Sequence, residues 1–246
     1  MSLKGKSALV TGGGTGVGRA TALMLAARGA HVAVNYSRSV DEASATVGEL
    51  EALGVDAVAI QADVASDAAV KAMVEQTVAV FGRLDVVVNS AGMTAFVDHG
   101  DLDGMHEDDW DRIQAVNLKG PFLVSRAATP HLRASGDGAI VNVSSLAGVT
   151  GTGSSLAYAA SKGGLNTLTK SLARALAPEI RVNSVAPGAV DTRWMDDHRD
   201  FLERAIEGMP LKRAASPEDI AGGVLLLVEN RFVTGEVLVM DGGASL

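Results

Sequence analysis

Residues 7–20 read SALVTGGGTGVGRA, a short apolar run that leads into a glycine-rich turn. Gly12, Gly16 and Gly18 give the turn the spacing G-x-x-x-G-x-G. Glycines permit a tight turn and a close approach of backbone to ligand, and the following helix N-terminus offers free N–H groups to a pyrophosphate. A merely flexible turn is the alternative. The position between a first strand and a first helix nevertheless favours a dinucleotide site.

Short apolar runs alternate with longer helical patterns along the rest of the chain. The runs are apolar almost throughout, which is typical of parallel strands buried on both faces. The pattern predicts an α/β fold, a single doubly wound (Rossmann) domain over residues 1–246 with a seven-stranded, mostly parallel sheet flanked by helices. The predicted strands cover residues 7–10, 32–34, 57–60, 86–88, 140–143, 182–185 and 237–239, and the predicted helices cover 16–28, 40–53, 66–81, 107–134, 156–177 and 216–229.

Composition excludes several classes of function. Hydrophobic residues make up 47% of the chain and charged residues 20%, as in a globular protein, and the formal net charge of -8 disfavours nucleic-acid and membrane partners. Without cysteine there is no disulfide or thiolate chemistry, and the five scattered histidines predict no metal site. The start lacks a signal-peptide pattern and no apolar run is long enough to span a membrane, so we expect a cytoplasmic protein.

A second informative feature is the pair Tyr158 and Lys162, with Ser145 thirteen residues before the tyrosine. Residues four apart on a helix project from one face. The ammonium of Lys162 should lower the pKa of Tyr158 from its ordinary value of about 10, which makes the tyrosine a candidate general acid/base. Alone, such a pair is common on surface helices, and composition does not choose between Ser144 and Ser145.

Together these motifs resemble the short-chain dehydrogenase/reductase family, in order and spacing, over essentially the whole chain. The family's asparagine pair after the fourth strand is represented by one asparagine followed by Ser90, which is a departure from the pattern. The positions that match are Thr11, Gly12, Gly16 and Gly18 in the turn, then Asn89, Ala91 and Gly92, then Asn117, Ser145, Tyr158 and Lys162, and finally Pro187, Gly188 and Thr192.

The resemblance implies a role for each of these residues. Tyr158 exchanges the proton with the substrate oxygen, Ser145 hydrogen-bonds the same oxygen, and Lys162 lowers the tyrosine pKa and holds the nicotinamide ribose. Asn117 organises a water in a proton relay. Cofactor contacts come from Tyr158 and Lys162 and from the matched residues of the turn, the segment after the fourth strand and the segment from Pro187 to Thr192. The plainer readings are a strand end at Ser145, a helix bend at Asn117 and an ordinary turn at Thr192.

The end of the second predicted strand bears on the choice of cofactor. Tyr36 occupies the position where a carboxylate would bind the ribose of NAD, and Ser37 and Arg38 follow it. Guanidinium groups pair well with phosphates, so NADP(H) is favoured and NAD(H) remains possible. An ordinary solvated loop charge at Arg38 is the alternative. Asp63 and Val64 match the family's adenine-contacting position.

The substrate is predicted only by class. Residues 190–212 hold apolar side chains amid charges, in the region that covers the substrate in the family, so we expect a small carbonyl compound or secondary alcohol. The alternative to a substrate-covering segment is an ordinary amphipathic helix that closes the edge of the domain. Carrier-linked substrates, as in a 3-oxoacyl-(acyl carrier protein) reductase, rank second, because Asp137 and Glu179 stand where basic docking residues would be expected.

Two further expectations concern assembly and the class of protein. The resemblance implies a homotetramer, built through the helices around 107–134 and 156–177 and the C-terminal segment 237–246. A catalytically silent, dinucleotide-sensing protein is the non-enzyme alternative, since a fold does not fix a function. The joint presence of Asn117, Ser145, Tyr158 and Lys162 favours the enzyme.

Overall fold

The computed structural model describes residues 3–246 as one α/β domain around a seven-stranded sheet, in which every strand pair is parallel. The strand order is β3-β2-β1-β4-β5-β6-β7. The strands are β1 (Ser7–Thr11), β2 (His31–Tyr36), β3 (Ala57–Gln61), β4 (Val86–Asn89), β5 (Gly138–Val143), β6 (Ile180–Pro187) and β7 (Val237–Met240). The predicted fold is confirmed, and the sheet is wholly rather than mostly parallel.

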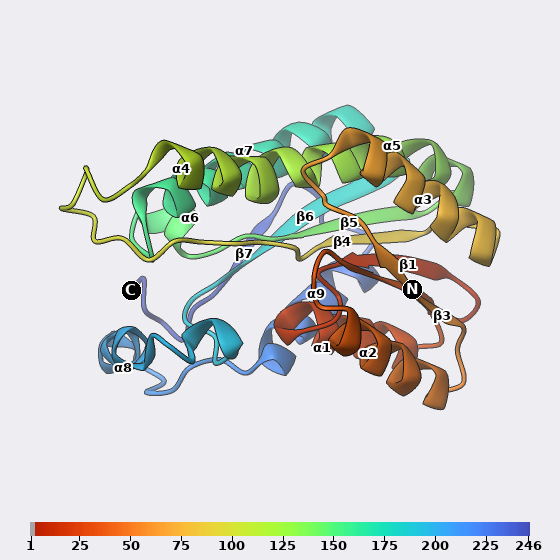
Figure 1. Cartoon of the computed structure of the whole chain (residues 1–246). Coiled ribbons are helices and arrows are strands. Elements are labelled where there is room, and N and C mark those ends of the chain that lie inside the picture. The colour runs from red at the N-terminus through yellow and green to blue at the C-terminus, as the bar shows by residue number, and fades with distance from the viewer. Residues whose placement is uncertain (1–2) are drawn as a thin grey trace.

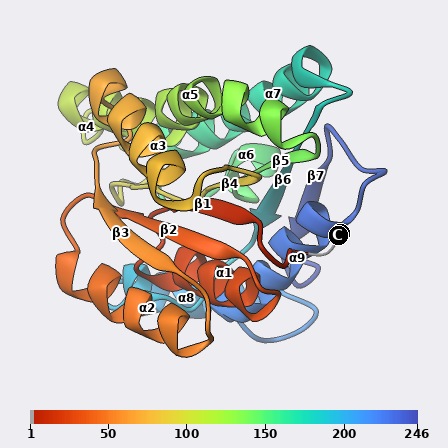
Figure 2. The ribbon, with the colours of Figure 1, turned by 90° about the vertical axis from the view of Figure 1, so that its right-hand side faces the viewer.

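Helices cover both faces of the sheet (Figure 1). One layer holds α1 (Gly16–Ala27), α2 (Val40–Ala52) and α9 (Pro217–Glu229), with α8 (Arg199–Gly208) beside it (Figures 1 and 2). The other layer holds α3 (Asp67–Phe81), α4 (Glu107–Gln114), the π-helical turn η1 (Ala115–Lys119), α5 (Gly120–Ser135), α6 (Ala147–Thr150) and α7 (Leu156–Leu176). A short 3-10 turn, η2 (Arg193–Met195), precedes α8.

The burial pattern explains why the sequence signal for the strands is strong. Every residue of β1, β4 and β6 is buried. Two apolar cores, one on each face, pack the sheet against its two helical layers. Strands covered on both faces need apolar side chains in both directions, which produces continuous apolar runs.

The predicted helices are present, with differences in detail. Helix α9 begins as expected, with Ser216 and Asp219 forming a capping box and Pro217 in the first turn. The run predicted at 107–134 is divided by η1 into α4 and α5. The short helices α6 and α8 are additional to the predicted set.

The topology fixes where a ligand can bind. From β1 the chain moves outward through β2 to β3, then returns to place β4 on the other side of β1. Connections leave the carboxyl ends of β1 and β4 in opposite directions, which opens a crevice at that edge. Both predicted motifs at this point, the glycine turn after β1 and the segment after β4, border this crevice.

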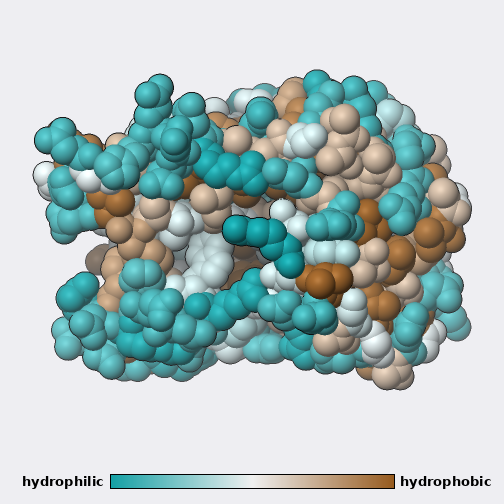
Figure 3. All heavy atoms as spheres, viewed as in Figure 1, coloured by the Kyte–Doolittle hydropathy of each residue, from teal (hydrophilic) through white to brown (hydrophobic). Residues whose placement is uncertain are grey.

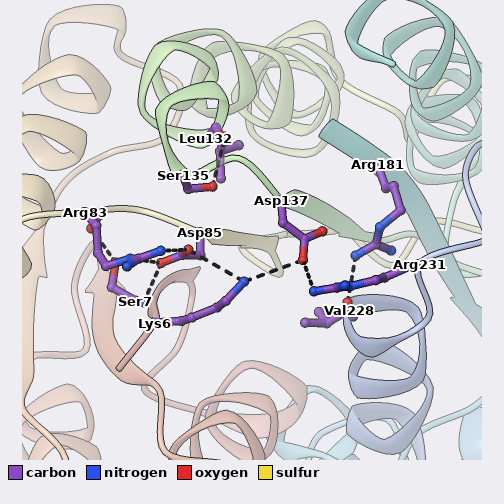
Figure 4. A network of polar contacts seen from close by, with 10 residues as sticks. All are labelled: Lys6, Ser7, Arg83, Asp85, Leu132, Ser135, Asp137, Arg181, Val228 and Arg231. Atoms are coloured by element: carbon purple, nitrogen blue, oxygen red, sulfur yellow. Dashed lines mark hydrogen bonds and ion pairs between the residues drawn. The ribbon is translucent and has the colours of Figure 1, made fainter. Parts of the chain in front are cut away.

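A network of charges occupies the opposite, amino-terminal edge of the sheet (Figure 4). Lys6 lies between two carboxylates, with its Nζ 3.9 Å from Asp85 and 3.6 Å from Asp137. Asp137 also pairs with Arg231, at 2.8 Å. Asp137 therefore belongs to the amino-terminal edge, at the far end of the strands from the crevice.

Within residues 3–246, no helix combines the length and the apolar character that crossing a bilayer requires. In the same residues, no group of three or more His, Asp or Glu side chains is arranged to hold a metal ion.

Candidate active site

A groove of about 540 Å³ lies at the carboxyl ends of the strands. It extends from Arg38, after β2, to Tyr158 on α7. Figure 3 shows a hollow between the two helical layers, with pale residues inside and hydrophilic residues on its rim. Most of the predicted site residues line the groove: Gly12, Gly16, Gly18, Ser37, Arg38, Asp63, Val64, Ala91, Gly92, Ser145, Tyr158, Lys162, Pro187, Gly188 and Thr192.

The glycine turn has no room for side chains. A Cβ at Gly18 would lie 2.3 Å from the carbonyl oxygen of Gly12, and Gly12 itself has a φ of +62°. Helix α1 starts at Gly16, and among the described residues Thr15 gives it no side-chain capping bond. Its first N–H groups therefore remain available to an anion. This tight, donor-rich cradle fits the pyrophosphate of a dinucleotide.

Two predicted cofactor residues, Thr11 and Asn89, are buried behind the groove wall. The Thr11 hydroxyl accepts hydrogen bonds from the backbone N–H groups of Ser90 (3.0 Å) and Ala91 (3.1 Å). The Asn89 amide donates to Asn142 Oδ1 at 2.8 Å. These contacts fix the segment after β4 in its place beside the turn.

Asn117 also lies behind the wall, in the π-helical turn η1. Its Oδ1 accepts from the N–H of Met93 and its Nδ2 donates to the carbonyl of Met93, both at 2.9 Å. The same Nδ2 donates to Ser161 Oγ on α7 at 3.1 Å. A π turn widens the helix by one residue and commonly occurs at functional sites. Here it lets one side chain join the segment after β4 to α7.

Asn35 is a supporting residue that the sequence analysis missed. It is buried in β2, where its Oδ1 accepts from the Gly12 N–H at 3.4 Å and its Nδ2 donates to the carbonyl of Ala62 at 3.1 Å. The side chain thus ties the glycine turn to the end of β3. An asparagine inside an otherwise apolar strand is the signal that could have identified it, because buried polar groups need partners.

Tyr158, Lys162 and Ser145 meet at the inner end of the groove. Ser145 hydrogen-bonds the Tyr158 hydroxyl. The Lys162 ammonium lies 5.6 Å from the centroid of the Tyr158 ring and donates to the carbonyl of Val143 at 2.8 Å. The neighbouring Ser144 points elsewhere, since its hydroxyl donates to the Lys162 carbonyl at 3.2 Å. Of the two serines, Ser145 is therefore the one beside the tyrosine.

The electrostatics of this cluster are governed by burial. Burial raises the pKa of Tyr158 to about 12, against a smaller lowering by the Ser145 hydrogen bond. Burial also lowers the pKa of Lys162 to about 8. The predicted lowering of the tyrosine pKa is thus wrong for the protein alone, because burial raises that pKa. At neutral pH the tyrosine is protonated and the lysine is mostly charged.

The position of α7 depends on two local features. The Ser155 side chain caps the helix by accepting from the Tyr158 N–H at 3.3 Å. Gly148, in α6, touches α7 so closely that a Cβ there would lie 2.4 Å from the carbonyl carbon of Lys162. This contact at Gly148 holds the helix turn that carries Tyr158 and Lys162 at a fixed distance from α6.

A second cavity has a volume of about 770 Å³, and Gly153 is among the residues that line it. A Cβ added at Gly153 would lie 3.7 Å from the Tyr158 ring, so this cavity begins near the tyrosine. Phe96, after β4, stacks on His198 with ring centroids 3.5 Å apart and meets Phe201 of α8 edge-on at 5.7 Å. Aromatic contacts thus join the segment after β4 to α8 across this cavity.

The segment between β6 and α9 lines part of the groove through Thr192, Arg193 and Trp194. It leaves the sheet next to a bridge between Val190 and Ala215. Trp194, in η2, lies edge-on to the Tyr158 ring at 6.5 Å. Thr192 lines the groove beside it.

Three arginines line the groove, and they differ in their partners. Arg112 pairs with Asp63 at 2.9 Å, and Arg193 pairs with Glu42 at 2.8 Å. Burial would raise the pKa of Asp63, but the Ala65 N–H and Arg112 outweigh it and lower that pKa. Within residues 3–246, Arg38 has no carboxylate partner, and it lies exposed beside Ser37.

Comparisons with known proteins find relatives over nearly the whole chain. A family model described as enoyl-(acyl carrier protein) reductase matches residues 12–245. The 3-oxoacyl-[acyl-carrier-protein] reductase of Staphylococcus aureus is 44% identical over 242 residues, which cover 97% of each chain. A dehydrogenase/reductase from Sinorhizobium meliloti, 40% identical, has a TM-score of 0.93 and covers 100% of this chain and 97% of its own. A short-chain dehydrogenase from Burkholderia cenocepacia, solved in complex with NADP, is 39% identical with a TM-score of 0.91 over both whole chains.

These matches extend over nearly the full sequence, and the range of the family model contains Gly12, Ser145, Tyr158 and Lys162. The chain belongs to the short-chain dehydrogenase/reductase family of NAD(P)-dependent oxidoreductases.

Proposed function

We propose that this protein is an NADP(H)-preferring oxidoreductase of small carbonyl compounds and secondary alcohols, with Tyr158 as the general acid/base. The observation that carries the proposal is the convergence of Tyr158, Ser145 and Lys162 at one end of a groove that the glycine turn also lines. A catalytically silent sensor would need the groove but not this cluster.

The family resemblance implies a role for each residue, and the chemistry of the side chains supports these roles. The bound dinucleotide supplies a hydride for reduction, or accepts one in the reverse direction. Ser145 donates a hydrogen bond to the substrate oxygen, which stabilises the negative charge that develops on it. Tyr158 gives its hydroxyl proton to that oxygen, and the positive charge of Lys162 favours the resulting phenolate. Lys162 also binds the ribose of the nicotinamide half, and Thr192 binds the nicotinamide amide. The relay through a water at Asn117 stays a prediction.

The unpaired Arg38 supports a preference for NADP(H). A guanidinium without a carboxylate partner is free to bind the additional 2′-phosphate, and the related Burkholderia cenocepacia enzyme was solved with NADP. We expect Arg38→Ala to weaken NADPH binding about 10-fold or more, since charged hydrogen bonds contribute about 1.5–3 kcal/mol. NADH binding should change less than about 2-fold, because NADH lacks the phosphate. Fluorescence titrations with NADPH and with NADH give the two dissociation constants. An unchanged ratio of the NADH constant to the NADPH constant in Arg38→Ala would contradict the role of Arg38.

We assign the substrate to the second cavity, which Phe96 and Phe201 border, and its charge supports a free small molecule. Four aspartates and two arginines line that cavity: Asp98, Asp196, Asp197, Asp200, Arg199 and Arg204. Because its aspartates outnumber its arginines, this cavity repels an acidic carrier protein. Asp137, one of the two residues that stand where basic docking residues would be expected, lies away from this cavity, in the charge network at the amino-terminal edge of the sheet (Figure 4). Glu179, the other one, directly precedes β6 and so lies at the same amino-terminal edge.

A 3-oxoacyl-(acyl carrier protein) reductase is the second candidate, because the Staphylococcus aureus relative with 44% identity has that name. The two candidate functions are distinguished by the kcat/KM for a free 3-oxo ester and the kcat/KM for the same acyl group on a carrier protein. The absorbance of NADPH measures both rates. We expect the carrier to raise kcat/KM by less than about 3-fold, because charge repulsion opposes docking. An increase of about 100-fold would favour the second candidate, since attraction between complementary surfaces strongly accelerates association.

Two predictions about organisation accompany the proposal. The segment from about 190 to 212 serves as the substrate cover, which the contact between Trp194 and the catalytic tyrosine supports. A homotetramer is expected from the family resemblance, and light scattering of the purified protein would measure it.

The experiment that tests the function itself uses the purified protein with NADPH and a panel of ketones and aldehydes. Turnover of any of them with NADPH oxidation supports the enzyme. Tight binding of NADPH without turnover of any carbonyl compound would favour the sensor. Binding of neither NADPH nor NADH would contradict the proposal.

A further inference from the structure

Arg193 makes a connection that the proposed reaction does not use. It lies in η2, at the start of the substrate cover, and its guanidinium reaches the N-terminus of α2. One terminal nitrogen donates to Glu42 Oε1 at 2.8 Å and the other donates to Ser39 Oγ at 3.0 Å. The bonded residues are more than 150 positions apart in the chain. The connection therefore joins two independent parts of the fold.

The two parts lie on either side of the glycine turn. A Cβ at Gly14 would lie 3.0 Å from Ala43 of α2, so α2 touches one side of the turn. A Cβ at Gly16 would lie 3.4 Å from the Thr192 side chain, so the cover touches the other side. Arg193 follows Thr192 directly, and Glu42 directly precedes Ala43. The Arg193–Glu42 pair consequently bridges the two walls that flank the pyrophosphate cradle.

The partners of Arg193 also indicate its role. Arg193 is neutralised by Glu42, unlike Arg38, whose guanidinium is unpaired within residues 3–246. A guanidinium engaged by a carboxylate and a hydroxyl is poorly placed to serve as the main phosphate ligand. Its bonds instead connect two walls of the groove, which are α2 and the segment that carries Thr192. We call this connection the tie.

We propose that Arg193 is a positioning residue: its bonds to Ser39 and Glu42 hold the substrate cover across the groove and slow the release of the bound dinucleotide. The proposal rests on the proposed function, because it requires a dinucleotide in the groove. It adds a determinant of cofactor residence that lies outside the reacting atoms.

The expected effect is modest and salt-dependent. Both partners are about half exposed, with side-chain exposures of 49% for Arg193 and 47% for Glu42. Exposed ion pairs of this kind change an equilibrium by about 2- to 5-fold. Salt screens exposed charges, so the contribution should fade as ionic strength rises.

The test measures NADPH release by stopped-flow fluorescence, with excess NADP⁺ as the displacing ligand. Arg193→Met, Glu42→Gln and the double variant are compared with the wild type at low and at high salt. We expect each single variant to release NADPH about 2- to 5-fold faster at low salt. The double variant should be no faster than the faster single variant, because both remove the same interaction. The differences should shrink at high salt.

Arg231→Met is the matched control. It removes an arginine from another exposed ion pair, with Asp137, at the far edge of the sheet. Its release rate should equal that of the wild type.

Glu42→Gln distinguishes the tie from a direct phosphate contact. If Arg193 bound the phosphates itself, loss of Glu42 would free it and slow release. Slower or unchanged release from Glu42→Gln would overturn the proposal, as would additive effects in the double variant. A folded wild type that binds no NADPH would instead overturn the proposed function, and the tie with it.

Discussion

Tyr158→Phe should lower kcat for carbonyl reduction by about 1,000-fold, within the range that general acid/base catalysis contributes. The substitution removes only the hydroxyl, which is the group that Ser145 hydrogen-bonds. The ring that meets Trp194 edge-on is retained, so the groove and its cover keep their packing. NADPH binding should therefore stay within about 2-fold of the wild type, because the variant keeps the other cofactor contacts. Steady-state turnover and NADPH titration on the same preparation measure both quantities.

The pH dependence of carbonyl reduction gives a second test of the role of Tyr158. Because burial raises the pKa of Tyr158 to about 12, the hydroxyl stays protonated throughout the neutral range in the protein alone. Reduction, which consumes that proton, should not lose activity through tyrosine ionisation between about pH 6 and 9. A Tyr158→Phe variant that kept a tenth or more of the wild-type kcat would show that another group supplies the proton.

The fold was predictable because its strands are buried on both faces. The fully buried strands β1, β4 and β6 leave continuous apolar runs in the sequence, and the glycine turn marks the first crossover. The helix boundaries at α9 were predictable for a local reason, the capping box at Ser216 and Asp219. Local signals of this kind need no knowledge of distant contacts.

The parts that were not predictable depend on long-range contacts. The π turn around Asn117 exists because one side chain bonds both Met93 and Ser161, and nothing in the helical pattern of 107–134 indicates it. The tie between Arg193 and Glu42 joins residues 151 positions apart. The predicted direction of the Tyr158 pKa shift was wrong, because the sequence does not show how deeply the folded chain buries this hydroxyl.

Lys162→Met should abolish most turnover and yet stabilise the protein at pH 7. Lys162 is 4% exposed, and burial lowers its pKa from 10.5 to about 8. Each pKa unit corresponds to about 1.4 kcal/mol, so the buried charge costs on the order of 3 kcal/mol. Methionine removes this cost but also removes the hydrogen bond to the Val143 carbonyl, worth about 1 kcal/mol. The net gain of about 1–2 kcal/mol should raise Tm by about 2–8 °C in a chain of this size.

The pH profile of this gain identifies the buried charge as its cause. Between pH 8 and 10.5 the unfolded wild type binds more protons at Lys162 than the folded one, so wild-type stability rises with pH across that window. The advantage of Lys162→Met should therefore be largest below pH 8 and shrink steadily above it. Lys170→Met, the same change at an exposed position of α7, should alter Tm little at any pH. A Lys162→Met variant whose Tm falls at pH 7, or whose advantage is the same at pH 7 and 9.5, would show that Lys162 is held at little electrostatic cost. The expected outcome instead means that the site keeps a destabilising charge because the chemistry at Tyr158 needs it.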